Sequence, residues 1–375
     1  MIKFSSIYVL NDDMKKKYYF FWGFLIISIL LFIISCSSEN IDNDLNVNGS
    51  SVYAGGYFID GENQYASYWV NGNKVILGEG EITDITVKDG IVYATGFDEN
   101  WDAVYWVDSE KTILQGNDTY SYSIFIHSQD VYVSGSFANG SCYWKNGSKF
   151  NLTTNADSEA FGIVVNENGD VITGGYYMNN HHALVPARWN GTKRVNLSKP
   201  QHGDAEIYEV KLKGNTPVFF GMAMKPNNMV GYVPTASYWH SGERTDCNNG
   251  GTWRDNIYGG EGRGGFASGN DIYVAGNIQH IGTVDSDGNP NPDEPGITPH
   301  YWKNGQIFDL PGGPVFDNYW VGGGRDIIAE DGQIIVGGWA SSSSQAQVAA
   351  TWVNGQLVYL EDKDIYSVIN SISID

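Results

Sequence analysis

The chain has few charged residues, few basic residues and few cysteines. Only 17% of its 375 residues are charged, and 22 lysines and arginines stand against 43 aspartates and glutamates, which gives a net charge of −21. A chain this acidic repels phosphate backbones and anionic lipid headgroups, so the composition argues against nucleic-acid binding. Solubility is the simplest explanation of the acidity.

Cysteine occurs three times, and Cys36 belongs to the N-terminal segment described next. Cys142 and Cys247 remain, and two cysteines in an exported chain can form a disulfide. They fall in the third and fifth copies of an internal repeat, which we do not expect to be neighbours. The Cys and His residues also lack metal-site spacing. No Ser-His-Asp arrangement can be read from the spacing either.

The first 36 residues differ in composition from the rest. Met14–Cys36 reads MKKKYYFFWGFLIISILLFIISC, with three lysines, a long apolar run, a small residue and a cysteine. This is the layout of a secretory signal, and Ile33–Cys36 resembles the lipobox of bacterial lipoproteins. The resemblance implies that Cys36 is diacylated and becomes the mature N-terminus. An uncleaved membrane anchor is the alternative, because the apolar run is about long enough to span a bilayer.

The residues after Cys36 indicate where such a lipoprotein resides. Two serines follow the cysteine, and acidic residues come close behind within Glu39–Asp44. An acidic start without aspartate at the second position favours the outer membrane, on its periplasmic face or at the cell surface. We therefore expect a signal over residues 1–36, a flexible tether over 37–48 and a folded domain over 49–375.

The folded part is built from a repeat rich in glycine and aromatic residues. DITVKDGIVYATG at Asp84–Gly96 has a counterpart 40 residues earlier, DLNVNGSSVYAGG at Asp44–Gly56. The end of this element returns as VYVSG, VITGG, VFFG, IYVAG and IIVGG, which makes seven copies. A repeat of this length is typical of solenoids and propellers.

A tryptophan follows each copy, and Asn-Gly comes within two residues of it in five of them. Asn-Gly between two apolar runs predicts a β-hairpin, because both turn residues need positive φ. The tryptophans are Trp69, Trp106, Trp144, Trp189, Trp239, Trp302 and Trp352.

Each copy is therefore predicted to form four short strands. One such unit cannot bury both its faces, whereas units packed around an axis can, with Trp and Tyr filling the gaps between them. The sequence predicts an all-β fold, a seven-bladed β-propeller of four-stranded antiparallel blades. Over roughly residues 44–375 the chain also resembles bacterial extracellular proteins with AxYWxNG-like units, called HAF-type repeats. That resemblance implies an architecture and no functional residue.

Two segments compete to complete the ring. INSISID at Ile369–Asp375 resembles ITDITVK at Ile82–Lys88, and DLNV near Leu45 also fits. Because ring closure usually pairs strands from both termini within one blade, we expect Ile369–Asp375 to be the inner strand of the first blade.

The connections differ between the two faces of the predicted ring. Turns after the first and third strands are short, whereas the other connections vary, from 9 residues between Gly135 and Trp144 to 26 between Gly276 and Trp302. Function is expected on the elaborated face. Aromatic rings beside polar residues suit sugars, although the rings can instead pack their own loops. The candidate ligand-binding residues are Trp101, Tyr177, His181, Trp253, Arg254 and Trp320.

One acidic loop is a candidate cation site. In DSDGNPNPDEPG, Asp285, Asp287 and Asn289 alternate, with Asp293 further on. Such oxygen ligands suit Ca²⁺, the one candidate cofactor, but the EF-hand glycine and glutamate are missing and a solvated loop is the alternative. The adjacent histidines at 181 and 182 point to opposite sides of an extended chain, which argues against a shared metal. GGEGRGG lacks the Lys-Ser/Thr of a phosphate loop.

The leading hypothesis is a non-catalytic module, lipid-anchored at the bacterial envelope, that binds a glycan or protein partner on the elaborated face. The alternatives are an assembly component of an envelope complex and a propeller glycosidase or lyase. Converging carboxylates about 5–10 Å apart at the mouth of the central channel would favour the enzyme. A flat aromatic platform there would favour glycan binding, and the lack of both would favour assembly.

Overall fold

The computed structural model describes residues 46–47, 49–153, 157–227, 231–248, 257–280, 296–314, 321–344 and 346–375. These residues belong to one compact unit, Asp44–Asp375, and its regular elements are β-strands. Among them no helix has the length and the apolar character that crossing a membrane requires. The predicted signal and Cys36 lie outside the described residues.

Five sheets have four antiparallel strands each, in which neighbours along the chain are neighbours in the sheet. They are β8 (Thr119–His127), β9 (Asp130–Phe137), β10 (Gly140–Lys145) and β11 (Ser148–Asn151); β12 (Ser158–Val165), β13 (Val171–Met178), β14 (Leu184–Asn190) and β15 (Lys193–Asn196); β16 (Ala205–Lys213), β17 (Thr216–Asn227), β18 (Gly231–His240) and β19 (Glu243–Asp246); β20 (Ile257–Ser268), β21 (Asp271–His280), β22 (Ile297–Lys303) and β23 (Gln306–Asp309); β24 (Gly322–Glu330), β25 (Gln333–Ser341), β26 (Gln347–Val353) and β27 (Gln356–Tyr359).

An eight-stranded sheet combines the two ends of the folded unit. Its strands are β1 (Asn46–Val47), β2 (Ser50–Asp60), β3 (Asn63–Val70), β4 (Asn73–Lys88), β5 (Ile91–Asp98), β6 (Ala103–Val107), β7 (Glu110–Ile113) and β28 (Ser367–Ile374).

The long strand β4 belongs to two ladders. Its residues up to Glu79 pair with β3, and those from Gly80 onward pair with β5. Gly78 and Gly80 have φ angles of 137° and 133°, which residues with a side chain rarely adopt. The two glycines therefore allow one strand to leave the first ladder and enter the second without a loop.

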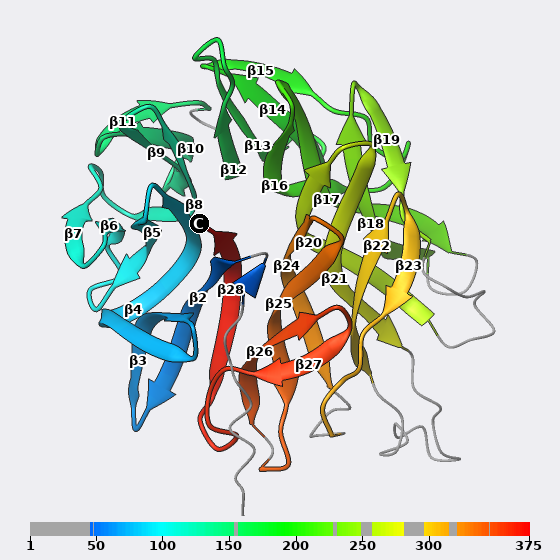
Figure 1. Cartoon of the computed structure of the whole chain (residues 1–375). Coiled ribbons are helices and arrows are strands. Elements are labelled where there is room, and N and C mark those ends of the chain that lie inside the picture. Colours follow the sequence, from blue (N-terminus) through cyan, green and yellow to red (C-terminus); the bar gives the residue numbers. More distant parts are fainter. Residues whose placement is uncertain are drawn as a thin grey trace, which may run out of the picture. The chain divides into compact units, whose positions relative to one another are not determined.

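The sheets are arranged around a common axis, as Figure 1 shows. Strands β4, β8, β12, β16, β20, β24 and β28 contact one another in this order, and β28 contacts β4 in turn, which closes the ring. We call these the innermost strands. Four-stranded antiparallel sheets placed radially around an axis form a β-propeller, so the predicted fold class is confirmed at this level.

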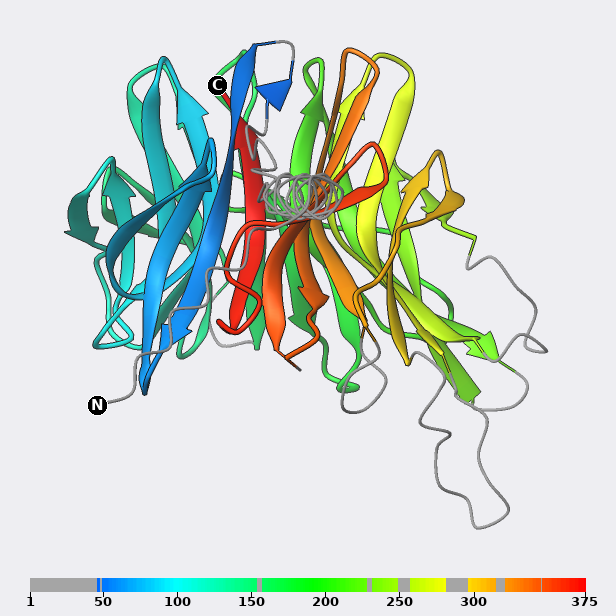
Figure 2. The same ribbon diagram turned by 60° about the horizontal axis from the view of Figure 1, so that its bottom comes forward.

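The C-terminal strand closes the ring. β28 pairs with β2 from Val52–Ile374 to Phe58–Ser367, whereas β1 adds only two pairs beside Ser50 and Ser51. Figure 2 shows β28 in red beside β2 in blue. The prediction that Ile369–Asp375, and not the DLNV segment, fills the inner position is therefore confirmed, with the strand beginning two residues earlier and ending at Ile374.

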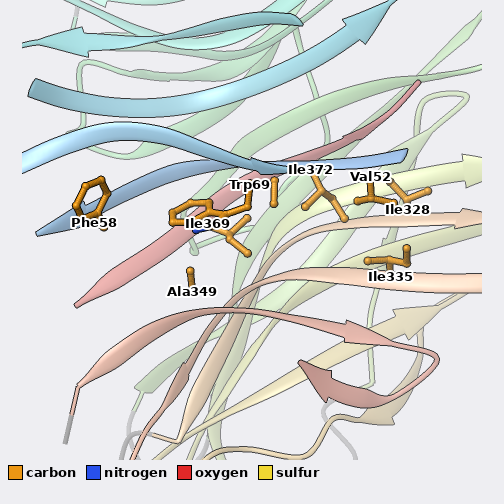
Figure 3. Packing of buried hydrophobic residues seen from close by; sticks show 9 residues of the cluster. Val52, Phe58, Trp69, Ile328, Ile335, Ala349, Ile369 and Ile372 are labelled. Atoms are coloured by element: carbon orange, nitrogen blue, oxygen red, sulfur yellow. The ribbon is translucent and has the colours of Figure 1, made fainter. Parts of the chain in front are cut away.

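Aromatic and aliphatic residues fill the spaces between neighbouring sheets. Figure 3 shows one such cluster, in which Trp69 and Phe58 of the eight-stranded sheet pack with Ile328, Ile335 and other aliphatic residues of β24–β27. All seven repeated tryptophans are at most 2% exposed. The predicted core position of Trp144 and Trp302 is confirmed, since both are fully buried.

Most of these tryptophans also tie one sheet to the sheet before it. The indole N–H of Trp144 donates to the carbonyl of Gln115 at 2.8 Å, and that of Trp302 donates to the carbonyl of Asn248 at 2.7 Å. Trp189, Trp239 and Trp352 make equivalent bonds just beyond the last strand of the preceding sheet. Trp106 has no such partner because β4 continues through that point without a connection.

Candidate functional site

The candidate ligand-binding residues selected from the sequence lie in several different repeats. Trp101 follows β5, is 67% exposed, and stacks on Phe97 with ring centroids 4.6 Å apart. Asp98 orders this loop. Its carboxylate accepts hydrogen bonds from the backbone N–H groups of Asn100 and Asp102, and it forms an ion pair with Lys111 at 2.7 Å. Burial opposes the ionisation of Asp98, but these hydrogen bonds outweigh it and lower its pKa.

Tyr177 and His181 belong to β13 and the connection after it. Tyr177 is half-buried, with the Arg194 guanidinium 3.6 Å above its ring and Asn196 donating to its hydroxyl at 3.1 Å. That ring packs within its own sheet, which agrees with the alternative interpretation. His181 is exposed, and its backbone N–H donates to Asn179. The other candidates lie outside the described residues, namely Trp253, Arg254, Trp320, Asp285, Asp287, Asn289 and Asp293.

A β-bulge recurs in every innermost strand, and the sequence analysis missed it. In β4, for example, Ile82 pairs with Gly96 and Asp84 pairs with Thr95, so the ladder skips Thr83. A bulge redirects the extra side chain. The skipped residues are Thr83, Tyr122, Phe161, Tyr208, Arg263, Arg325 and Asn370. All of these bulge residues line one cavity of about 260 Å³, which we call the channel cavity.

Glutamates stand two residues before four of these bulges, at Glu81, Glu159, Glu206 and Glu261. Glu81 accepts hydrogen bonds from Gln64 at 3.0 Å and from Asn370 at 2.8 Å. Tyr122 donates to Glu159 at 3.1 Å, and Glu261 is ion-paired with Arg263. Burial raises the pKa of Glu81, Glu159 and Glu206, so each of these carboxyl groups holds its proton to higher pH than an exposed glutamate.

Three further carboxylates, one residue after the bulges, join neighbouring innermost strands. Asp84 accepts the backbone N–H of Ile124 at 2.8 Å, and Glu209 accepts that of Gly265 at 2.7 Å. Asp326 accepts the backbone N–H of Ile372 at 3.0 Å. Burial raises the pKa of Glu209 and Asp326. Because backbone N–H groups of the neighbouring strands already engage these carboxylates, we assign them a structural role in holding the ring together.

A second cavity, the mouth cavity, has a volume of about 360 Å³ and shares Arg263 and Arg325 with the channel cavity. The rings of Tyr57 and Tyr366 stack at its edge, with centroids 6.3 Å apart and planes at 28°. Tyr366 is 37% exposed, and its hydroxyl donates to Gln347 at 2.8 Å. Trp339 and the amides of Asn277 and Gln279 also line the cavity.

The mouth cavity lies on the elaborated face. Trp339 and Gln347 flank the connection between β25 and β26, and Tyr366 lies in the connection from β27 to β28. Glycine keeps the cavity open at one wall, because a Cβ on Gly323 would stand 3.0 Å from the indole nitrogen of Trp339. The elaborated face therefore carries a cavity, but none of the candidate ligand-binding residues from the sequence is among the described residues that line it.

A third cavity of about 790 Å³ opens beside the first strands β8 and β12. Its lining includes the carboxylates Asp118, Asp157 and Glu159 and the exposed Tyr120. Tyr122 belongs to both this cavity and the channel cavity. This cavity is lined by three carboxylates and no basic side chain, whereas the mouth and channel cavities combine carboxylates with Arg263 and Arg325.

No group of three or more His, Cys, Asp or Glu side chains is arranged to hold a metal within the described ranges. Cys142 on β10 and Cys247, directly after β19, are free and buried. Burial raises the pKa of the Cys142 thiol to about 12, and it raises that of Cys247 as well. Both thiols are therefore poor nucleophiles and metal ligands at neutral pH.

No family model matches the chain, and no curated protein matches it. Among solved structures it is similar to the β-propeller domain of the Trilobed protease from Pyrococcus furiosus, at 10% identity over 83% of this chain and 97% of that one, with a TM-score of 0.48. It is also similar to the acylaminoacyl peptidase of Pyrococcus horikoshii, at 10% identity over 82% of this chain and 53% of that one, with a TM-score of 0.44. A GH43 endo-arabinanase from Bacillus licheniformis matches at 11% identity over 63% and 94%, with a TM-score of 0.29. The resemblance to HAF-type repeat lipoproteins stays a prediction.

Proposed function

We propose that this chain is a non-catalytic lipoprotein of the bacterial outer membrane whose seven-bladed propeller binds a glycan at the mouth cavity. The blade count follows if the eight-stranded sheet is read as two blades that share β4. The ladder switch between Glu79 and Gly80 supports this reading, as does the ring of innermost strands. The lipid anchor at Cys36 rests on the sequence pattern.

The observation that carries the binding proposal is the combination of groups around the mouth cavity. Tyr57 and Tyr366 offer aromatic surface, and Asn277 and Gln279 offer amide donors and acceptors. Sugars need both, because their C–H faces stack on rings while their hydroxyls hydrogen-bond to polar side chains. A volume of about 360 Å³ falls within the roughly 300–1,000 Å³ of small-ligand pockets.

A propeller glycosidase or lyase is the second candidate, and one observation favours it. Burial raises the pKa of Glu159 and Glu206, and the charge of Glu159 raises the pKa of Glu206 further. A raised pKa is what a general acid needs. Against catalysis, neighbouring donors already engage these groups, since Tyr122 donates to Glu159 and Tyr208 to Glu206. We therefore favour binding without reaction.

A glycan array with the purified chain tests the proposal. We compare the wild type with Tyr366→Ala, which removes an exposed ring of the mouth cavity. Tyr232→Ala is the matched control, because Tyr232 on β18 is 36% exposed against 37% for Tyr366 and does not line the cavity. We expect glycan binding by the wild type and the control, and at least a tenfold weaker signal for Tyr366→Ala. Cleavage of bound glycans would instead support the enzyme, and binding to no glycan would reject the proposal.

The anchor has a separate test. A diacylated cysteine buries acyl CH₂ groups in the bilayer at about 0.8 kcal/mol each. Cys36→Ser should therefore move the protein from the membrane fraction to the soluble fraction of a bacterial host. Retention in the membrane fraction would favour the uncleaved anchor.

A further inference from the structure

One charged side chain lies between the two central cavities. Arg325 lines both the mouth cavity and the channel cavity. Within the part of the chain that the structure describes, its guanidinium makes no ion pair and no hydrogen bond. Arg263, the other arginine of these cavities, is paired with Glu261 and lies 4.8 Å over the ring of Tyr208.

The carboxylates that could neutralise Arg325 are bonded to other groups. Glu81 and Glu261 act on Arg325 electrostatically. The two oxygens of Glu81, however, are held by Asn370 at 2.8 Å and Gln64 at 3.0 Å, and Glu261 is held by Arg263. Arg325 is therefore a cation inside a cavity, close to acids that are already engaged.

Such a cation is costly to keep without a counter-ion. Arg325 is half-buried, and the hydration that its charge loses carries a free-energy penalty unless hydrogen bonds and an opposite charge replace it. Burial lowers the pKa of Arg325, and the like charge of Arg263 lowers it further. Both effects would be relieved by an anion bound between the two cavities.

We infer that Arg325 binds a carboxylate of the ligand, so that the bound glycan is an acidic one containing a uronic acid. This inference rests on the proposed glycan-binding function. A guanidinium matches the planar carboxylate with two parallel N–H···O bonds. Tyr366 and Tyr57 are placed to stack against the sugar ring, and Asn277 and Gln347 to meet its hydroxyls.

The negative net charge of the chain does not oppose this assignment. At −21 the whole chain repels an anion at long range, but 0.15 M salt screens exposed charges beyond about 8 Å. At the mouth cavity the charged side chains are Glu261, Arg263 and Arg325, and because Glu261 is paired with Arg263, the charge of Arg325 is left unbalanced there. The local field is therefore less negative than the composition suggests.

Calorimetric titration with matched ligands tests the inference. The ligands are oligosaccharides of galacturonate, glucuronate and mannuronate, each beside its neutral methyl ester, and a sulfated galactose oligosaccharide. The proteins are the wild-type chain, Arg325→Gln and Arg325→Lys. Arg194→Gln is the control, because Arg194 lies over Tyr177 and not at the cavity. Thermal melting shows that each variant is folded.

We expect the wild type and Arg194→Gln to bind at least one uronate about tenfold or more tightly than its methyl ester. Arg325→Gln should abolish this preference, and Arg325→Lys should keep only part of it because it retains the charge but not the paired donors. Equal affinity for acid and ester, or an unchanged preference in Arg325→Gln, overturns the inference and leaves glycan binding intact. Binding of the sulfated ligand alone overturns the carboxylate assignment. Binding of no glycan overturns the proposed function itself.

Discussion

The repeated tryptophans and the bulge residues each occur once in every repeat, but the residue type is constant at the first position and variable at the second. The tryptophan position carries the same side chain in every copy, at most 2% exposed. The bulge position carries Thr, Tyr, Phe, Tyr, Arg, Arg and Asn and lines a cavity. Every gap between neighbouring sheets makes the same packing demand, whereas a cavity that binds one ligand needs different groups around it. Uniform positions therefore build the ring, and two of the varied positions, Arg263 and Arg325, contribute to the proposed site at the mouth cavity.

Removing the closing strand should have the largest effect on the uniform part. Deletion of Ile369–Asp375 leaves most of the inner edge of β2 unpaired and removes Ile369 and Ile372 from their core cluster. We expect a marked fall in melting temperature, measured by circular dichroism. Deletion of Asp375 alone is the control. An unchanged melting temperature in the longer deletion would mean that another segment closes the ring.

Truncating one repeated tryptophan should cost less but still a large part of the stability. Trp302→Ala removes a fully buried ring and its hydrogen bond to Asn248, so the free energy of unfolding should fall by roughly 3–5 kcal/mol. Urea denaturation measures the change. A loss under about 1 kcal/mol would contradict the packing role of this position.

The pH dependence of stability tests the buried glutamates that stand two residues before the bulges. Burial raises the pKa of Glu206 above its ordinary value of 4.5. The folded chain therefore keeps this proton when the unfolded chain has lost it, and the free energy of unfolding falls as pH rises from about 4.5 through the folded pKa. In Glu206→Gln this contribution is absent, so the stability of the variant relative to the wild type should increase over that interval.

The control for this measurement is Glu243→Gln, because Glu243 is exposed on β19. Its urea-derived stability should follow that of the wild type at each pH. Parallel curves for Glu206→Gln and the wild type would contradict the conclusion that burial raises the pKa of this carboxyl group.

Trp101→Ala should have the smallest effect. The ring is 67% exposed and its main contact is the stack on Phe97, so the free energy of unfolding should change by less than about 0.5 kcal/mol. Glycan binding should also stay unchanged, because Trp101 does not line the mouth cavity. Loss of binding in this variant would return the site to the loop that the sequence analysis selected.

The sequence predicts the uniform features well because each is encoded locally. Asn-Gly turns with positive φ form where expected, for example Asn71-Gly72 at 48° and 69°. The repeated tryptophans are buried, and the C-terminal segment pairs with β2. The turns after the third strands are two residues long throughout, and the connections after the second strands vary, as predicted.

The proposed site was not predicted because it depends on the pairing register and on residues brought together from several sheets. Thr83 and Arg325 are recognised as bulge residues only when the ladders of β4 with β5 and of β24 with β25 are known. The mouth cavity joins Tyr57, Gln279 and Trp339, which stand far apart along the chain. One signal in the sequence could have found part of it. Four innermost strands carry a glutamate two residues before the bulge residue, and aligning the repeats on this glutamate places Glu81, Glu159, Glu206 and Glu261 at one position.

Hydrogen–deuterium exchange with the glycan selected on the array tests most directly whether the varied positions form the site. The account predicts that the glycan slows amide exchange in residues 321–326 and 366–371, which carry Arg325 and Tyr366, and leaves residues 98–103 around Trp101 unchanged. Slowed exchange confined to residues 98–103, with none at the mouth cavity, would contradict it.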